Sequence, residues 1–385
     1  MDNQNKSKMI LLLGFMAFLA NGDNYAAAPL LLNIATDLHL SVETAAVSVT
    51  AYMLAFGAFT LLFGPLSDRF GKVKIINIAA MGTALFSILG GFAFNLTSLI
   101  FLRAMNGAFA AGIFPVTMAL VGQSYDDAHR HKALGKVMGL MFLGGASATA
   151  IGGALAYFGS WRVVYIAYGA AELIAALLML KLLQRDTPVI STLNYVKAYR
   201  EPLGNPKFMR IVLTIFFVGF SVFGTFTYSG KLLQQLTGYD VLGVGLILSL
   251  FGLGTVLGGR LAPKLKQRTG ARYFILTGVL GSLSLYALSA GRSLYLLVPG
   301  LFFFGVAFIF LQSTLVAAAQ ETLPKTRGTA MSMASFNMFV GGAIGTGINA
   351  KIIGASGIPT IYLIASVIML LIGFAAYAQF KEKKN

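Results

Sequence analysis

The chain has 385 residues, of which 57% are hydrophobic and only 11% are charged, whereas soluble proteins have about 25% charged residues. Apolar runs of membrane-spanning length recur along the chain, which excludes a soluble globular protein and predicts a helical protein embedded in the lipid bilayer. The net charge of +16 does not indicate nucleic acid as a partner, because the basic residues lie in short loops between apolar runs, as topology signals do. There is no cysteine, which excludes disulfides and thiolate chemistry.

The apolar runs predict twelve spans, since a helix needs about 20 residues to cross a ~30 Å hydrocarbon core. The first run, Met9–Ala35, is too long and too polar at its centre for a cleavable signal. The expected spans are 9–35, 42–66, 73–94, 97–122, 133–157, 161–183, 208–230, 241–263, 271–290, 294–318, 328–351 and 358–380. We therefore expect an all-α membrane protein.

The longest connection, residues 184–207, is polar and interrupted by proline. It divides the chain into a six-helix bundle at 1–183 and a second one at 208–385, with the connection itself as a cytoplasmic linker. If the N-terminus is inside, 24 of the 29 lysines and arginines fall on the inner side and four on the outer side. This bias predicts that both termini are cytoplasmic.

The two halves carry the same markers. The charged turn Gly64–Lys74 has a partial repeat at Gly259–Arg272, and the basic turn Arg130–Lys132 recurs as Lys325–Arg327, both at an offset of 195 residues. This repetition indicates an internal duplication and hence two pseudo-symmetric bundles. Repeat-built transporters place their substrate between the repeats, near the middle of the bilayer.

Two opposite charges are expected at similar depth within the membrane. Asp23 lies 14 residues past Met9, or about 21 Å from the inner surface, and Arg103 lies about 18 Å from that surface by the same rise per residue. A charge in mid-bilayer costs about 2.5–3.5 kcal/mol, and pairing would offset that cost. Asp23 is therefore predicted to be a proton or cationic-substrate site, with a fixed structural ion pair as the alternative. Arg103 is predicted to have a functional role, in proton coupling or in contact with a substrate anion, and the alternative is a purely structural role.

A third charge, Glu172, lies near the middle of span six. It is a further candidate for proton or substrate coupling, and the alternative is a protonated residue that bonds to a neighbouring helix or faces lipid. Other polar residues of the spans could line a substrate cavity or serve helix packing. They are Asn21, Asn24, Tyr25, Tyr52, Asn106, Thr225, Tyr228, Gln312 and Asn337.

Glycines gather in span five and again in span eleven, where small residues let helices approach and slide. They predict either close packing alone or a hinge at the moving contact between the halves. The hinge candidates in span five are Gly144, Gly145, Gly152 and Gly153.

Sequence signals for an enzyme are missing: there is no GxxxxGK[ST] phosphate loop, no metal-ligand spacing of His and Cys, and no GxSxG. We therefore expect no catalysis, no cofactor, no metal and no ATP hydrolysis. The energy for transport would come from an ion gradient or from the gradient of the substrate.

The turn at Gly64, G-P-L-S-D-R-F-G-K-V-K-I-I, resembles the loop motif G-x-L-a-D-R-x-G-r-k-x-x-l of the major facilitator superfamily. Leu102–Gly107 is similar to the fourth-span motif of the drug:proton antiporter branch, with Asn106 where Gln is usual. Gly144–Gly153 resembles that branch's fifth-span motif, but Ala148 and Thr149 replace its Gly and Pro.

The resemblance implies a twelve-helix inner (plasma) membrane transporter, monomeric, in which two bundles rock around a cavity lined by spans one, four, seven and ten. It implies proton-coupled export of small amphipathic or drug-like molecules, in which Asp23 takes a proton from outside, competes with substrate and releases the proton inside. By the same resemblance, a conformational latch at the inner surface comprises Gly64, Asp68, Arg69, Gly71 and Lys72. A sugar or metabolite importer or uniporter on the same fold is the first alternative, and a receptor or scaffold without transport is the second.

Overall fold

The computed structural model describes residues 3–125, 127–184, 186–187, 195–324 and 326–381, and within these ranges all regular structure is helical. Twelve helical segments are long and apolar enough to span a membrane, which confirms the predicted fold class. Several marker positions of the linker and of the repeated turns, namely 185, 188–194 and Lys325, lie outside the described residues.

The first bundle contains eight helices, because two of its spans are each built from two helices. They are α1 (Asn3–Asp37), α2 (Val42–Ala45), α3 (Val47–Phe70), α4 (Lys72–Gly90), α5 (Leu96–Ala110), α6 (Ile113–Ser124), α7 (Asp127–Phe158) and α8 (Trp161–Leu182). Helix α9 (Tyr195–Leu203) belongs to the linker. The second bundle contains α10 (Pro206–Phe226), α11 (Ser229–Thr237), α12 (Val241–Thr269), α13 (Arg272–Ala290), α14 (Leu294–Thr322), α15 (Arg327–Ser356) and α16 (Ile358–Phe380).

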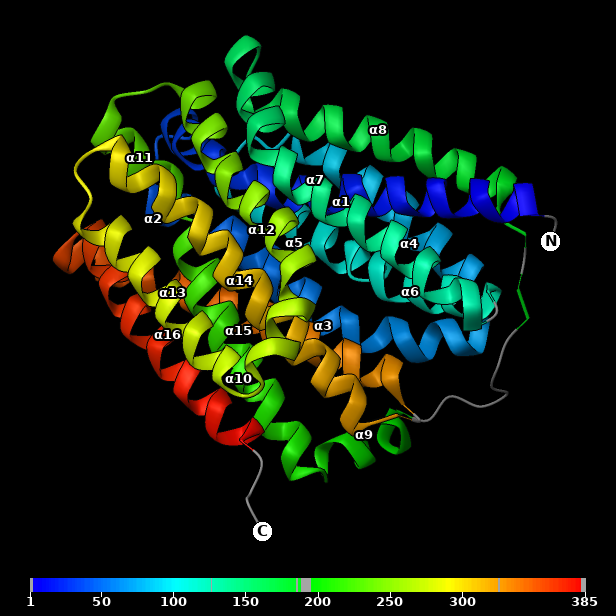
Figure 1. Ribbon diagram of the computed structural model, residues 1–385. Coiled ribbons are helices and arrows are strands. Elements are labelled where there is room, and N and C mark those ends of the chain that lie inside the picture. Colours follow the sequence, from blue (N-terminus) through cyan, green and yellow to red (C-terminus); the bar gives the residue numbers. More distant parts are fainter. Residues whose placement is uncertain (1–2, 126, 185, 188–194, 325, 382–385) are drawn as a thin grey trace.

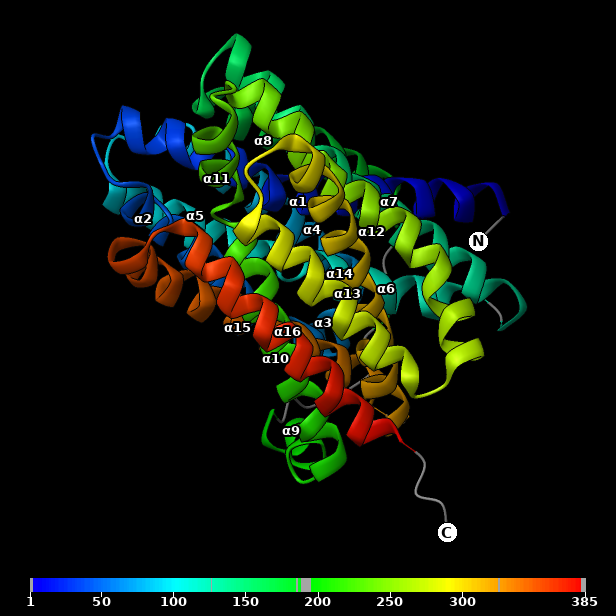
Figure 2. The same cartoon turned by 60° about the vertical axis from the view of Figure 1, so that its left-hand side comes forward.

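The two bundles lie side by side with equivalent packing (Figure 1). Helix α1 packs on α7 in the first bundle as α10 packs on α15 in the second. Between the bundles, α7 packs on α12 and α3 packs on α15, which are again equivalent pairs of spans. The view in Figure 2 shows the start of α1 and the end of α16 toward the same end of the molecule. We call this end the terminal end and the opposite one the far end.

The charged turn at Gly64–Lys74 joins α3 to α4 at the terminal end. Gly71 has φ +92°, a conformation that favours glycine, and it lets the chain reverse direction. The carboxylate of Asp186 accepts hydrogen bonds from the backbone N–H groups of Lys72 (2.8 Å) and Val73 (2.9 Å). These donors have no partner within α4, so Asp186 caps this helix from the chain that follows α8.

The bundles are tied together at the far end. Lys231 of α11 and Glu43 of α2 form an ion pair at 2.5 Å, and a Cβ on Gly230 would clash with the carbonyl oxygen of Ala28. Gly153 of α7 lies similarly close to the Val241 backbone. This tight contact between α7 and α12 is not found toward the terminal end of α7, where a Cβ on Gly139 would meet nothing within 4 Å.

Candidate functional site

Asp23 of α1 and Arg103 of α5 meet inside the first bundle, as their calculated depths predict. Arg103 Nη1 lies 3.4 Å from both carboxyl oxygens of Asp23, and each residue is only 1% exposed. The same nitrogen donates to Asn106 Oδ1 at 3.1 Å, and Asn106 in turn donates to the Thr83 carbonyl oxygen at 3.0 Å. Asn106 therefore positions the guanidinium and does not line a cavity.

Two tyrosine rings lie close to the guanidinium of Arg103. Its Cζ lies 4.4 Å from the ring centroid of Tyr52 and 5.0 Å from that of Tyr165. The Ser87 hydroxyl lies 3.3 Å from Asp23 Oδ2. Cation–π contacts stabilise a desolvated guanidinium by about 2 kcal/mol or more, so Arg103 is held by the rings as well as by Asp23.

Glu172 of α8 completes this group, and we call Asp23, Arg103 and Glu172 the ion cluster. Glu172 is fully buried, so it does not face lipid, and it interacts electrostatically with Asp23 and Arg103. Both of its carboxyl oxygens lack a hydrogen-bond partner among the described residues, as do Nε and Nη2 of Arg103 and the hydroxyls of Tyr165 and Tyr168. The described ion pair of Arg103 is with Asp23, and the charge of Glu172 interacts with both at longer range. The three side chains together are neutral when they hold one proton.

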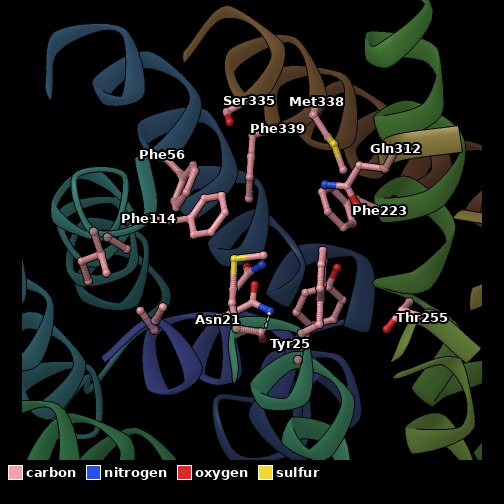
Figure 3. A pocket seen from close by; sticks show the side chains of 18 of the residues that line it. Asn21, Tyr25, Phe56, Phe114, Phe223, Thr255, Gln312, Ser335, Met338 and Phe339 are labelled. Carbon is pink, nitrogen blue, oxygen red and sulfur yellow. Dashed lines mark hydrogen bonds between the residues drawn. The ribbon is translucent and has the colours of Figure 1, made fainter. Parts of the chain in front are cut away.

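A central cavity of about 110 Å³ lies between the bundles. Eight spans line it, namely one, two, four and five of the first bundle and seven, eight, ten and eleven of the second. The predicted set of four spans was incomplete, because α3, α7, α12 and α15 also turn toward the pseudo-symmetry axis. In Figure 3, Phe56 and Phe114 face Gln312 and Phe223 across the open space.

The lining is apolar, aromatic and uncharged. None of its 24 described residues is Asp, Glu, Lys, Arg or His, whereas seven are Phe and two are Tyr. Toward the far end, the ring of Tyr25 packs on Phe226 from the second bundle, with centroids 5.8 Å apart, and this contact closes the cavity there. At the other end the lining reaches Met331, only four residues from the start of α15, so the cavity extends toward the terminal end.

The structure places five of the nine predicted cavity residues in the lining: Asn21, Asn24, Tyr25, Tyr52 and Gln312. Asn106 belongs to the ion cluster. The other three lie outside the lining and bond to backbone carbonyls of their own bundle: Thr225 to Ser221, Tyr228 to Thr346, and Asn337 to Met333. Thr255, Ser335 and the phenylalanines of the lining were not predicted, because nothing in a one-dimensional pattern separates a cavity-facing Phe from a lipid-facing one.

The ion cluster is not part of this lining, and Tyr52 connects the two. Among the residues that the structure describes, Tyr52 alone both lines the cavity and stacks on the Arg103 guanidinium. Asp23 itself does not reach the cavity in this conformation. The predicted competition between substrate and proton at Asp23 would therefore have to act through Tyr52.

The predicted latch residues all lie around the turn at the terminal end. Asp68 pairs with Lys72 at 3.0 Å within the turn, and the guanidinium of Arg69 lies over the Phe70 ring. Gly64 lies close to the Ser332 hydroxyl of α15, which is where this region approaches the second bundle. The described ion pair of Asp68 thus stays within the first bundle, and a latch to the second bundle remains a prediction for another conformation.

The four hinge glycines have different neighbours. Gly144 and Gly152 lie against α1 of their own bundle, and Gly145 lies beside Asn21 in the cavity wall. Only Gly153 contacts the other bundle, where its Cα approaches Val241 and Gly245 of α12. Spans five and eleven both make contacts between the bundles: span five packs mainly on span eight, and span eleven mainly on span two.

The described residues contain no group of three or more His, Asp or Glu side chains that could hold a metal ion. The arrangement as a whole is that of a membrane transporter. Two bundles enclose a cavity at mid-membrane, one end is closed by contacts between the bundles, and a buried titratable group lies beside the cavity.

Comparison with known proteins agrees with this class. The family model described as Major Facilitator Superfamily matches residues 13–346, and the chain belongs to this family.

Multidrug resistance protein 2 of Bacillus subtilis is 24% identical, and the match covers 100% of this chain and 97% of that protein. Multi-drug resistance efflux pump PmrA of Streptococcus pneumoniae is 26% identical, with coverages of 84% and 82%. A solved bacterial homologue of the human lysosomal transporter Spinster has the same fold, with a TM-score of 0.77 at 17% identity over 99% of this chain and 98% of that one. The chain is therefore a multi-pass inner-membrane transporter.

Proposed function

We propose that this protein is a monomeric, proton-coupled exporter of small amphipathic or drug-like molecules, with both termini in the cytoplasm. The observation that carries the proposal is the ion cluster, in which two buried carboxyl groups accompany one buried cation: Asp23 is paired with Arg103, and Glu172 is buried without a hydrogen-bond partner among the described residues. A buried group of this composition is neutral with one proton and carries an uncompensated charge without it. Such intramembrane carboxyls are typical of proton pathways in transporters.

In the proposed cycle the structure corresponds to a state that is closed at the far, outer end and faces the terminal, cytoplasmic end. The cluster loses its proton to the cytoplasm as substrate enters the cavity. The bundles then rock, the contact between Glu43 and Lys231 opens, and substrate leaves to the outside. A proton from outside returns the cluster to neutrality. One charge that crosses 100 mV supplies about 2.3 kcal/mol, which is enough for a severalfold concentration gradient.

Tyr52 would transmit the protonation state to the cavity. The centroid of its ring lies 4.4 Å from Arg103 Cζ and 6.0 Å from the centroid of Phe56, and the Phe56 ring stacks on Phe339 of the second bundle with centroids 4.0 Å apart. A shift of Arg103 when the charge of the cluster changes would therefore move rings that line the cavity and meet between the bundles. Names of two relatives refer to drug resistance, and this agrees with export.

The alternative, a sugar or metabolite importer, fits the lining less well. A sugar needs a hydrogen-bonding partner for most of its hydroxyls, because unpaired polar groups are costly to bury. The lining offers five polar side chains besides its tyrosines, and two of these already bond to backbone carbonyls, Asn21 to Met141 and Thr255 to Gly252. The nine aromatic rings suit an amphipathic compound better.

The test is transport by purified protein in liposomes with an imposed pH gradient. The probes are N-phenyl-1-naphthylamine for export and radiolabelled glucose for the alternative. We expect N-phenyl-1-naphthylamine to move in the direction opposite to that of the protons, and Asp23→Asn to abolish this movement while the protein stays folded. Glucose uptake without aromatic transport would favour the importer, and full pH-gradient-dependent export by Asp23→Asn would refute the coupling role of Asp23.

A further inference from the structure

Uncharged polar groups provide all the side-chain hydrogen bonding in the described cavity lining. The polar side chains that are neither aromatic nor charged are Asn21, Asn24, Thr255, Gln312 and Ser335. The charged side chains of the ion cluster are at most 1% exposed and are not part of the lining, where Tyr52 lies against the Arg103 guanidinium. A molecule in the cavity therefore meets amides, hydroxyls and aromatic rings, and no formal charge.

This lining discriminates by charge. An ion of either sign that leaves water for the cavity loses its hydration, and no opposite charge compensates it there. Aromatic rings attract a cation, but a ring contact returns less than full desolvation costs. An uncharged aromatic compound loses little hydration and packs its ring among Phe56, Phe223 and Phe339.

Two amides in the lining have unused hydrogen-bonding capacity. Asn24 Oδ1 and Gln312 Oε1 are buried without a partner among the described residues. Asn24 lies on α1 and Gln312 on α14, so the two amides belong to opposite bundles. Because the oxygens are unbonded in the protein, each amide is free to rotate and to turn either its oxygen or its NH2 group toward a ligand. A ligand that bonds to both would hold the bundles together around itself.

We propose that the cavity selects uncharged aromatic molecules that carry a neutral hydrogen-bonding group, held by Asn24 and Gln312, and that it disfavours permanent cations and anions. This proposal rests on the proposed function, since it names the substrate class of that transporter. In this proposal the groups that exchange protons lie in the ion cluster, and the site that binds substrate contains no charged side chain.

The test measures binding to purified protein in lipid nanodiscs, with uptake by empty nanodiscs subtracted and no pH gradient. Three probes share the naphthylmethyl group and a tetrahedral end: neutral 1-neopentylnaphthalene, cationic (1-naphthylmethyl)trimethylammonium and anionic 1-naphthylmethanesulfonate. We expect the neutral probe to bind at least about tenfold more tightly than either ion. Cation binding that equals or exceeds that of the neutral probe overturns the proposal.

A second pair of probes isolates the hydrogen bond. N-phenyl-1-naphthylamine and 1-benzylnaphthalene differ only in N–H against CH2. The amine should bind severalfold more tightly to the wild-type protein, and Gln312→Leu should remove the difference. An equal affinity of the two probes for the wild-type protein contradicts the role of the amides.

Gln312→Glu provides a gain of function that a misfolded protein could not show. The new carboxylate should raise the affinity of the ammonium probe relative to the neutral probe by about tenfold, whereas Gln320→Glu, on α14 outside the lining, should leave the ratio unchanged. An unchanged ratio in Gln312→Glu counts against the proposal.

The outcomes also separate this inference from the proposed function. If the protein selects the neutral probe but shows no proton-driven transport, the proposed function is wrong and this inference stands. If the protein prefers a cation and exports it with protons as the driving force, this inference is wrong and the proposed function stands.

Discussion

At the scale of single residues, the proposed coupling of protons to transport depends on the three ionisable side chains of the ion cluster. Asp23 and Arg103 are paired; Asp23 also accepts from the Ser87 hydroxyl, and Arg103 also donates to Asn106, whereas both carboxyl oxygens of Glu172 lack a partner among the described residues. Removal of one partner of a buried pair leaves an uncompensated charge and costs about 3–5 kcal/mol. Glu172 can be changed without breaking such a pair, so it separates a transport role from a structural one.

Glu172→Gln should abolish the dependence of export on the pH gradient, because the cluster then cannot change its charge by protonation at that position. The melting temperature should stay close to that of the wild-type protein, since no hydrogen bond to a described residue is lost. Proteoliposome export over a series of imposed pH gradients measures the first effect. A variant with the wild-type dependence on the gradient would leave Asp23 as the only proton site.

Tyr52→Leu should uncouple transport from the proton gradient, whereas Tyr52→Phe should retain coupling, because phenylalanine keeps the ring that stacks on Arg103. The readout is the ratio of protons taken up to substrate released, with exchange of substrate in the absence of a gradient as the control. Both variants should still exchange substrate. Equal coupling ratios in Leu and Phe variants would exclude the ring as the connection between cluster and cavity.

At the scale of helices, the turn between α3 and α4 depends on a residue far away in sequence. Asp186 accepts from two backbone donors at the start of α4, and its negative charge lies at the positive end of that helix. The sequence motif contains the glycine that permits the turn but not the carboxylate that caps it.

Asp186→Ala should destabilise the protein by about 1–2 kcal/mol, the usual cost of a lost helix cap. Thermal unfolding in detergent should show a lower melting temperature than the wild-type protein, and Asp186→Asn should be intermediate because its amide oxygen can still accept. Glu201→Ala, an exposed acidic residue of α9, is the matched control. A melting temperature for Asp186→Ala equal to that of the control would show that the cap contributes nothing.

At the scale of the whole molecule, the ion pair between Glu43 and Lys231 holds the bundles together at the far end. Both side chains are about one-fifth exposed, at 21% and 19%, so the pair is expected to contribute about 1 kcal/mol. That amount shifts an equilibrium between two conformations by about fivefold.

Glu43→Gln should therefore increase the population that is open at the far end, and the charge swap Glu43→Lys with Lys231→Glu should restore the closed state. The natural chain has no cysteine, so spin labels on Phe94→Cys and Tyr295→Cys, which are exposed in opposite bundles at that end, report the distance directly. A distance distribution that is the same in all three proteins would exclude the pair as a gate.

The class of fold follows from local properties of the sequence. Span length, the apolar runs and the repeat at 195 residues define twelve helices in two related bundles, because each helix satisfies its own backbone in lipid. The pairing of Asp23 with Arg103 also follows, since two lone charges at one depth have a strong reason to meet.

Which polar side chain faces the cavity was decided by the tertiary structure. Tyr52, Thr225, Tyr228 and Asn337 look alike in sequence, yet only Tyr52 lines the cavity. In a bilayer both lipid and cavity accept apolar surface, so hydrophobic periodicity does not distinguish the two faces of a helix. The place of Glu172 in the ion cluster was also decided by tertiary packing. The packing of α8 on α1 and α4 sets the rotation of α8 about its axis, and this rotation turns Glu172 into the bundle. The sequence by itself thus determined the twelve helices and the existence of an intramembrane charge pair, and the packing of helices alone decided that this pair lies outside the central cavity.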